Sequence, residues 1–140
     1  MDNKLRLERL TELQGMLTHH DQLFKNLYFD MGTWFDPKDG HEDQQKNVTA
    51  SCGTAACALG SAALHKPFMK QGLRISGDVP VFKGEYGEAA GAKFFGITDM
   101  ESASLFDPSE YEDWFNVSTT EVADKVAALI EKYKGENNES

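Results

Sequence analysis

Long apolar runs are missing from this sequence, since no stretch approaches the roughly 20 residues that a transmembrane helix needs. The first residues, MDNKLRLERLTELQ, are charged throughout and lack the apolar segment of a secretory signal peptide. We therefore expect a cytoplasmic protein with no membrane partner. Because that compartment keeps thiols reduced, Cys52 and Cys57 are expected to remain reduced.

Basic residues are also scarce. The chain has 14 Lys and Arg against 23 Asp and Glu, which gives a net charge of −9. Arginine is rare, with Arg6, Arg9 and Arg74 as the whole set. An electrostatic field of this sign repels phosphate backbones and anionic lipids, so nonspecific binding to nucleic acids is disfavoured.

Repeats at the period of a solenoid are absent as well. Hydrophobic residues make up 40% of the 140 positions, and nine residues are Phe, which is enough for a packed core. The length fits one domain. We predict a single globular domain over 1–135 and a frayed tail over 136–140.

Apolar residues near the start of the chain recur at steps of three and four, at Leu10, Leu13, Leu17, Phe24 and Leu27. This spacing predicts an amphipathic helix over 4–27. The aromatic stretch 28–35 breaks the period and predicts a short strand or an ordered loop that buries Trp34. Residues 36–50 are polar and rich in turn formers, which predicts an exposed loop.

Capping and turn signals define the remaining elements. Ser51 is an N-cap candidate for a helix that runs to Lys66 and stops at Pro67. In chain order, the other predicted elements are a hairpin over 68–85, a helix over 86–97 with Ala89, Ala92 and Phe95 inward, a helix capped by Thr98, a turn capped by Asp107, and a last helix that opens at Ser118 and ends at Gly135. Together they predict an α+β fold that is mainly helical, with about five helices and one small β-hairpin.

The segment 50–67, ASCGTAACALGSAALHKP, places both cysteines at the expected start of the second helix. In a helix start, the amides of Gly53, Thr54 and Ala55 are unpaired and carry the positive end of the helix dipole, which suits an anion. The Cys52 thiol and the Thr54 hydroxyl complete this candidate ligand site. Further residues assigned to it are Thr33, Trp34 and Arg74.

The same position favours Cys52 as a nucleophile, because a helix start lowers the pKa of a thiol. A nucleophile needs a base, and His41 is the only histidine in the flanking loop, although a loop histidine is more often simply solvated. Five helical residues rotate by about 500°, so Cys52 and Cys57 would diverge, and no CxxC or HxxxH pair is present. We predict no metal site and no cofactor, with Cys57 as a small buried residue.

Three stretches carry a resemblance to a known group of proteins. They are FDMGTW at 29–34, CGTAACALGSA at 52–62 and, more loosely, FFGIT to SLFDP at 94–108. The chain resembles small uncharacterised proteins of tailed phages and bacteria, in which a Cys-Gly-Thr-x-x-Cys-x-x-Gly segment follows a DMxxW-like stretch. Members often have Trp where this chain has Ser61. The resemblance implies a phage-like setting, with the host cytoplasm as the location, and it implies no mechanism.

Three classes of function remain. The first, which we favour, is a small protein that binds an anionic metabolite or nucleotide, such as a host nucleotide signal, at the helix start over 52–54. The second is a thiol hydrolase that uses Cys52 and His41. The third is an interaction module that blocks a host protein through its acidic surface. The sequence leaves open both the oligomeric state and whether the chain is an enzyme.

Overall fold

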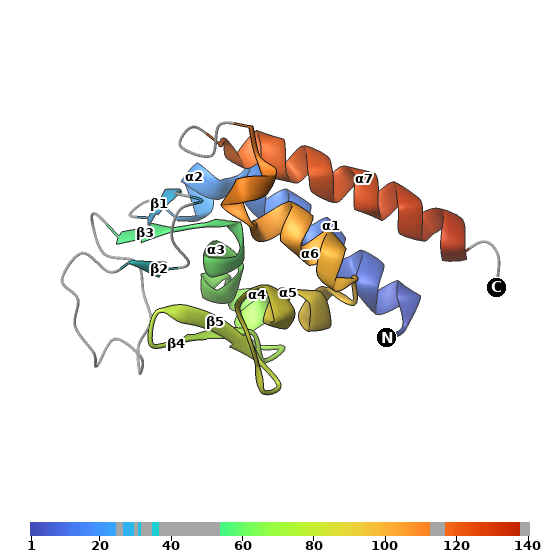
Figure 1. Ribbon diagram of the computed structural model, residues 1–140, viewed down its shortest axis with the longest axis horizontal. Coiled ribbons are helices and arrows are strands. Elements are labelled where there is room, and N and C mark those ends of the chain that lie inside the picture. Colours follow the sequence, from blue (N-terminus) through green and yellow to red (C-terminus); the bar gives the residue numbers. More distant parts are fainter. Residues whose placement is uncertain (25–26, 30, 32–34, 37–53, 113–116, 138–140) are drawn as a thin grey trace.

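The structure, a computed structural model, describes residues 1–24, 27–29, 31, 35–36, 54–112 and 117–137. In chain order the described elements are α1 (Asn3–Thr18), α2 (His20–Leu23), β1 (Leu27–Phe29), β2 (Phe35–Asp36), β3 (Thr54–Ala56), α3 (Ala58–Leu64), α4 (Lys66–Met69), β4 (Arg74–Ser76), β5 (Val79–Phe82), β6 (Glu85–Tyr86), α5 (Gly87–Phe95), α6 (Asp99–Phe106), the 3-10 helix η2 (Pro108–Glu110) and α7 (Thr119–Asn137). The fold is α+β and mainly helical, as the sequence predicts (Figure 1).

The two long helices, α1 and α7, pack side by side although they lie at opposite ends of the chain (Figure 1). The predicted inward leucines of α1, Leu10, Leu13 and Leu17, are fully buried. Helix α7 starts at a reciprocal capping box, in which the Glu121 amide donates to Ser118 Oγ at 3.2 Å and the Ser118 amide donates to Glu121 Oε1 at 3.3 Å. The helix continues past the predicted end at 135 to Asn137.

The predicted helix over 4–27 is wrong in its second half. Helix α1 ends at Thr18, α2 is a separate turn of four residues, and Leu27 already belongs to β1. His19, between the two helices, has φ −110° and ψ 25°, which breaks the helix. The apolar period continues across this break because both segments face the same core, and period alone does not reveal a change of chain direction.

The predicted helix over 51–66 is also wrong at its start. Thr54–Ala56 form the central strand β3, which pairs in parallel with β1 and antiparallel with β2. The helix begins only at Ala58, and its N-cap is Cys57 rather than Ser51. In β3 the backbone N–H and C=O groups form hydrogen bonds with β1 and β2 instead of within a helix. These tertiary contacts override the helix propensity of Ala55 and Ala56.

The second sheet contains the predicted hairpin and one further strand. Its order is β4-β5-β6, all antiparallel. Gly77 has φ 68° in the two-residue turn between β4 and β5. Lys83 and Gly84, between β5 and β6, have φ values of 46° and 84°, as a type I′ hairpin turn requires.

Aromatic rings from α4, β5, α5 and α6 form the centre of the core. The rings of Phe68, Phe82, Phe94, Phe95 and Phe106 contact one another at centroid distances of 5.0–6.2 Å, mostly edge to face. The inward positions predicted for α5 are correct for Ala92 and Phe95, whereas Ala89 is exposed and Ala90 is buried in its place. The cap predicted at Thr98 is confirmed, and Glu101 completes a capping box with it.

Two glycines in helices are expected to respond in opposite ways to replacement by alanine. A Cβ at Gly91 in α5 would lie 2.9 Å from Phe106 Cε2 and 3.1 Å from Ser102 Oγ. Phe106 is fully buried and cannot move away easily, so Gly91→Ala should lower the free energy of unfolding by about 1–2 kcal/mol. A Cβ at Gly15 would meet nothing within 4 Å, so Gly15→Ala should raise it by about 0.5–1 kcal/mol.

Urea denaturation followed by circular dichroism measures both changes. The close approach of α5 and α6 is disproved if Gly91→Ala is as stable as the wild type while Gly15→Ala shows the expected gain.

Candidate functional site

The residues of the ligand site predicted from the sequence do not form a helix start in the described structure. Thr54 and Ala55 lie in the middle of a sheet, opposite Leu27 and Tyr28 of β1. Arg74 lies in the other sheet, where it is exposed and paired with Val81. The remaining predicted residues, Cys52, Gly53, His41, Thr33 and Trp34, lie outside the described residues. Anion binding by this segment and the hydrolase hypothesis therefore stay predictions, but the helix-start argument no longer applies to Thr54 and Ala55.

Cys57 has the buried role that the sequence suggests. Its side chain is 1% exposed, and its Sγ accepts a hydrogen bond from the Gly60 amide at 3.4 Å. Every residue from Ala58 to Leu64 behind it is buried. Cys57 therefore contributes to packing and to the capping of α3.

A cavity of about 200 Å³ lies in the crevice between α1 and the α4 segment. Its lining residues are Leu5, Glu8, Arg9 and Glu12 from α1, and Pro67, Phe68 and Gln71 from α4 and the turn after it. The four α1 residues follow the spacing i, i+3, i+4 and i+7, which places them on one helical face. We call this cavity the α1–α4 crevice.

Arg9 is the unusual residue of the α1–α4 crevice, because its side chain is charged and yet only 9% of the residue is exposed. Its Nε donates to Gln71 Oε1 at 2.8 Å, and its Nη1 donates to the Phe94 carbonyl oxygen at 2.6 Å. The guanidinium carbon also lies 4.1 Å from the centroid of the Phe94 ring. Burial lowers the pKa of Arg9 from its ordinary value, as expected for a cation removed from water.

The partners of Arg9 are all neutral. Among the described residues, no carboxylate forms an ion pair with its guanidinium, and its Nη2 group makes no hydrogen bond. A buried charge is costly when it has no counter-ion, and buried arginines usually pair with a carboxylate or phosphate. Arg9 therefore has the chemistry to bind an anion that the described residues do not supply.

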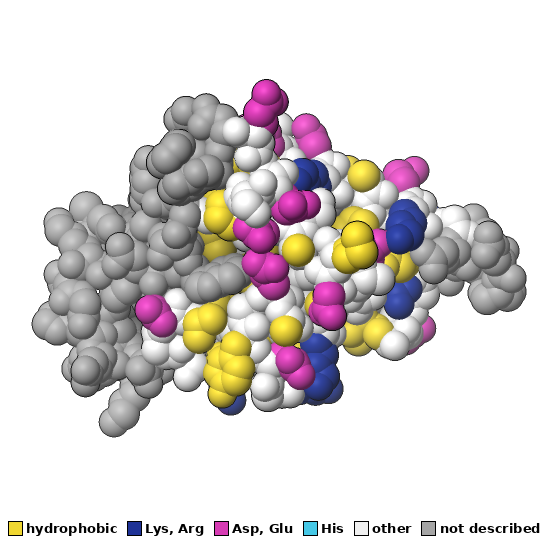
Figure 2. Space-filling view, in the orientation of Figure 1, with side chains coloured by type: hydrophobic (Ala, Val, Ile, Leu, Met, Phe, Trp, Pro, Cys, Tyr) yellow, Lys and Arg dark blue, Asp and Glu magenta, His cyan; other side chains and the backbone are white. Residues whose placement is uncertain are grey.

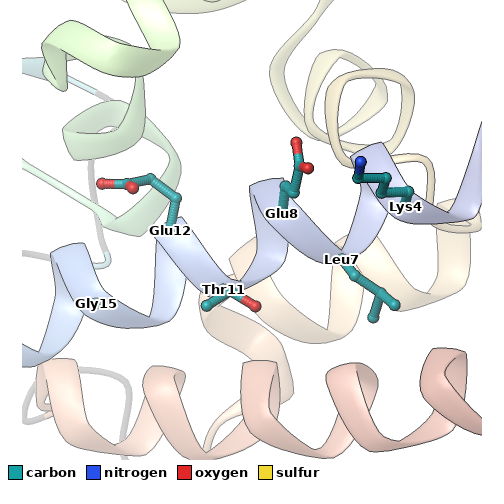
Figure 3. Close-up of a pocket in the computed structure, with 6 residues that line it drawn as sticks. All are labelled: Lys4, Leu7, Glu8, Thr11, Glu12 and Gly15. Carbon is teal, nitrogen blue, oxygen red and sulfur yellow. The ribbon is translucent and has the colours of Figure 1, made fainter.

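Two carboxylates stand at the rim of the same crevice. Glu12 accepts a hydrogen bond from His65 Nε2 at 2.7 Å, which forms a second bridge across the crevice beside Arg9–Gln71. The Glu12 side chain is 47% exposed, and Glu8 is exposed as well. Figure 3 shows Glu8 and Glu12 projecting from the same side of α1.

A second, wider hollow of about 620 Å³ runs along α1 and shares Glu8 and Glu12 with the crevice (Figure 3). Its other lining residues are Lys4, Leu7, Thr11 and Gly15. All six come from one helix, so the described part of the chain gives this hollow no second wall that could enclose a small ligand. Acidic side chains are spread among apolar ones over the described face in Figure 2, and they do not gather in one patch.

A buried polar pair joins α2 to α3. His20 Nε2 and Ser61 Oγ are 2.9 Å apart, and the two residues are 1% and 0% exposed. Burial lowers the pKa of His20, with Asp21 opposing this effect, so the imidazole is neutral near pH 7. The Nδ1 atom is buried without a hydrogen-bond partner. This depth places the pair inside the core, with Phe24 and Phe29 packed on the ring.

Sequence reasoning missed Arg9 as a site residue. One signal was present, because Arg9 lies four residues from Leu13 on the apolar side of a helix and belongs to a small set of arginines. Its partners gave no signal, since Gln71 and Phe94 are 62 and 85 residues away in the sequence.

Within the described ranges, no three His, Cys, Asp or Glu side chains lie close enough to hold a metal ion. In the same ranges, no helix combines the length and apolar character needed to cross a bilayer. Comparisons of the chain with protein-family models, curated proteins and solved structures give no significant match.

Proposed function

We propose that the protein binds a small organic carboxylate in the α1–α4 crevice, with Arg9 as the anion-binding residue. The observation that carries this proposal is a buried guanidinium that lines a cavity and has only neutral partners. A planar guanidinium matches the geometry of a carboxylate, and a charge-assisted hydrogen bond is stronger than a neutral one. The proposal keeps the class of anionic ligand that the sequence favours and assigns it to different residues.

The size of the crevice limits the ligand. A volume of about 200 Å³ corresponds to roughly six or seven water molecules at about 30 Å³ each. The crevice can surround a carboxylic acid of a few carbons, whereas a nucleotide would extend beyond it. Leu5, Pro67 and Phe68 supply apolar walls for its hydrocarbon part.

The test is to supply the missing counter-ion from within the chain. Gln71→Glu places a carboxylate oxygen where Gln71 Oε1 now lies, 2.8 Å from Arg9 Nε. The variant should fold, because the only other bond of this side chain is an exposed one from Nε2 to the Pro67 carbonyl oxygen. The new carboxylate should compete with the ligand and weaken its binding about tenfold or more.

The matched control is Gln22→Glu, the same change at an exposed position of α2. Calorimetry on the wild type and both variants would use a panel of two- to five-carbon carboxylates, including hydroxy acids and amino acids, with the corresponding neutral amides. We expect binding of at least one carboxylate to the wild type and to Gln22→Glu, and much weaker binding to Gln71→Glu. Equal affinity of the two variants, or no binding of any carboxylate to the wild type, rejects the proposal.

A further inference from the structure

The charges around the α1–α4 crevice favour a carboxylate ligand that also carries a positive charge. Arg9 supplies one positive charge, while Glu8 and Glu12 supply two negative charges at the rim of the same cavity. His65 uses one oxygen of Glu12, and no described cation pairs with Glu8. A ligand with only a negative charge would reach Arg9 past two carboxylates of the same sign, which lowers its affinity.

We propose that the ligand is a compact zwitterion, an amino acid in size and charge. Its carboxylate binds Arg9, and its ammonium group binds Glu8, with the exposed oxygen of Glu12 as a further acceptor. This assignment rests on the proposed function and adds the second charge of the ligand. An ammonium group has three donors and no acceptor, so exposed carboxylate oxygens are suitable partners for it.

The positions of the two charges along α1 support this arrangement. Glu8 and Arg9 are adjacent in the sequence and both line the crevice, yet Arg9 is buried and Glu8 is exposed. The cavity therefore has a cationic inner end and an anionic rim. Lys4, one turn before Glu8, lines the outer hollow and not the crevice, and the two side chains form no ion pair.

The ligand test compares molecules that differ in one charged group. L-alanine and propionate differ only in the ammonium group, and L-alaninamide has the ammonium group without the carboxylate. Calorimetry at pH 7 and low ionic strength should give L-alanine an affinity at least about tenfold higher than that of propionate or L-alaninamide, as expected when one charge-assisted hydrogen bond is lost.

The protein test uses Glu8→Gln, which keeps the size of an exposed side chain and removes its charge. This variant should bind L-alanine about fivefold more weakly or worse, and it should bind propionate as well as or better than the wild type. The matched control is Glu131→Gln, the same change at a side chain that is 75% exposed on α7 and far from the crevice in the chain, which should leave both affinities unchanged.

The outcomes separate the two proposals. If propionate binds as tightly as L-alanine and Gln71→Glu weakens both, the zwitterion assignment is wrong and the carboxylate site at Arg9 stands. If Glu8→Gln leaves the affinity for L-alanine unchanged, Glu8 does not hold the ammonium group and the assignment is again wrong. If none of the three molecules binds, the zwitterion assignment is overturned, and failure of the whole carboxylate panel overturns the proposed function as well.

Discussion

Replacing Phe68 with alanine is expected to lower the free energy of unfolding by about 3–5 kcal/mol, the largest effect that we predict for this protein. Phe68 is fully buried, and its ring contacts His65, Phe94 and Phe95 at centroid distances of 5.1, 5.1 and 5.5 Å. These neighbours come from α5 and the α3–α4 junction and are held by their own contacts. The space left by the ring would therefore collapse only partly.

Urea denaturation of Phe68→Ala and of Met69→Ala provides the measurement and its control. Met69 follows Phe68 in α4 but is 37% exposed, so its replacement should change the free energy of unfolding by about 0.5 kcal/mol or less. Similar losses for the two variants would contradict the placement of Phe68 at the centre of the core. A loss near 3–5 kcal/mol for Phe68 alone would support it.

Replacing Glu101 with glutamine is expected to cost about 2–3 kcal/mol at pH 7. The Glu101 carboxylate accepts hydrogen bonds from Lys132 Nζ at 2.5 Å, from the Tyr133 hydroxyl and from the Thr98 amide at 2.9 Å. Burial by itself would raise the pKa of Glu101, but these bonds and the charge of Lys132 outweigh it and lower the pKa to about 2. The carboxylate therefore ties α6 to α7 in its charged form.

The pH dependence of stability gives a second measurement for Glu101. Its pKa in the folded protein is about 2, below its ordinary value of 4.5, so the stabilisation is complete above pH 4.5 and is lost as the pH falls toward 2. The difference in stability between the wild type and Glu101→Gln should shrink over this window. Glu131→Gln is the control, because that carboxylate is 75% exposed and its pair with Lys134 is weak. A constant difference from pH 7 to pH 2 would show that Glu101 does not act through its charge.

Local signals in the sequence determined most of the helices. A capping box spans only four residues, so the caps at Thr98 and Ser118 could be recognised without any knowledge of the tertiary structure. The hairpin at β4 and β5 likewise follows from Gly77 and the alternation around it. The apolar stripe of α1 was visible for the same reason, since its period is a property of one segment.

The tertiary structure alone decided the conformation of Thr54–Ala56 and the composition of the α1–α4 crevice. Those three residues become a strand because β1 and β2, more than 15 residues away in the chain, pair with both of their edges. Arg9 becomes an anion-binding candidate because Gln71 and the Phe94 carbonyl oxygen, 62 and 85 residues away, hold its guanidinium at a cavity wall. Sequence patterns report the preferences of neighbouring residues, whereas strand pairing and the enclosure of a charge depend on groups that only folding brings together.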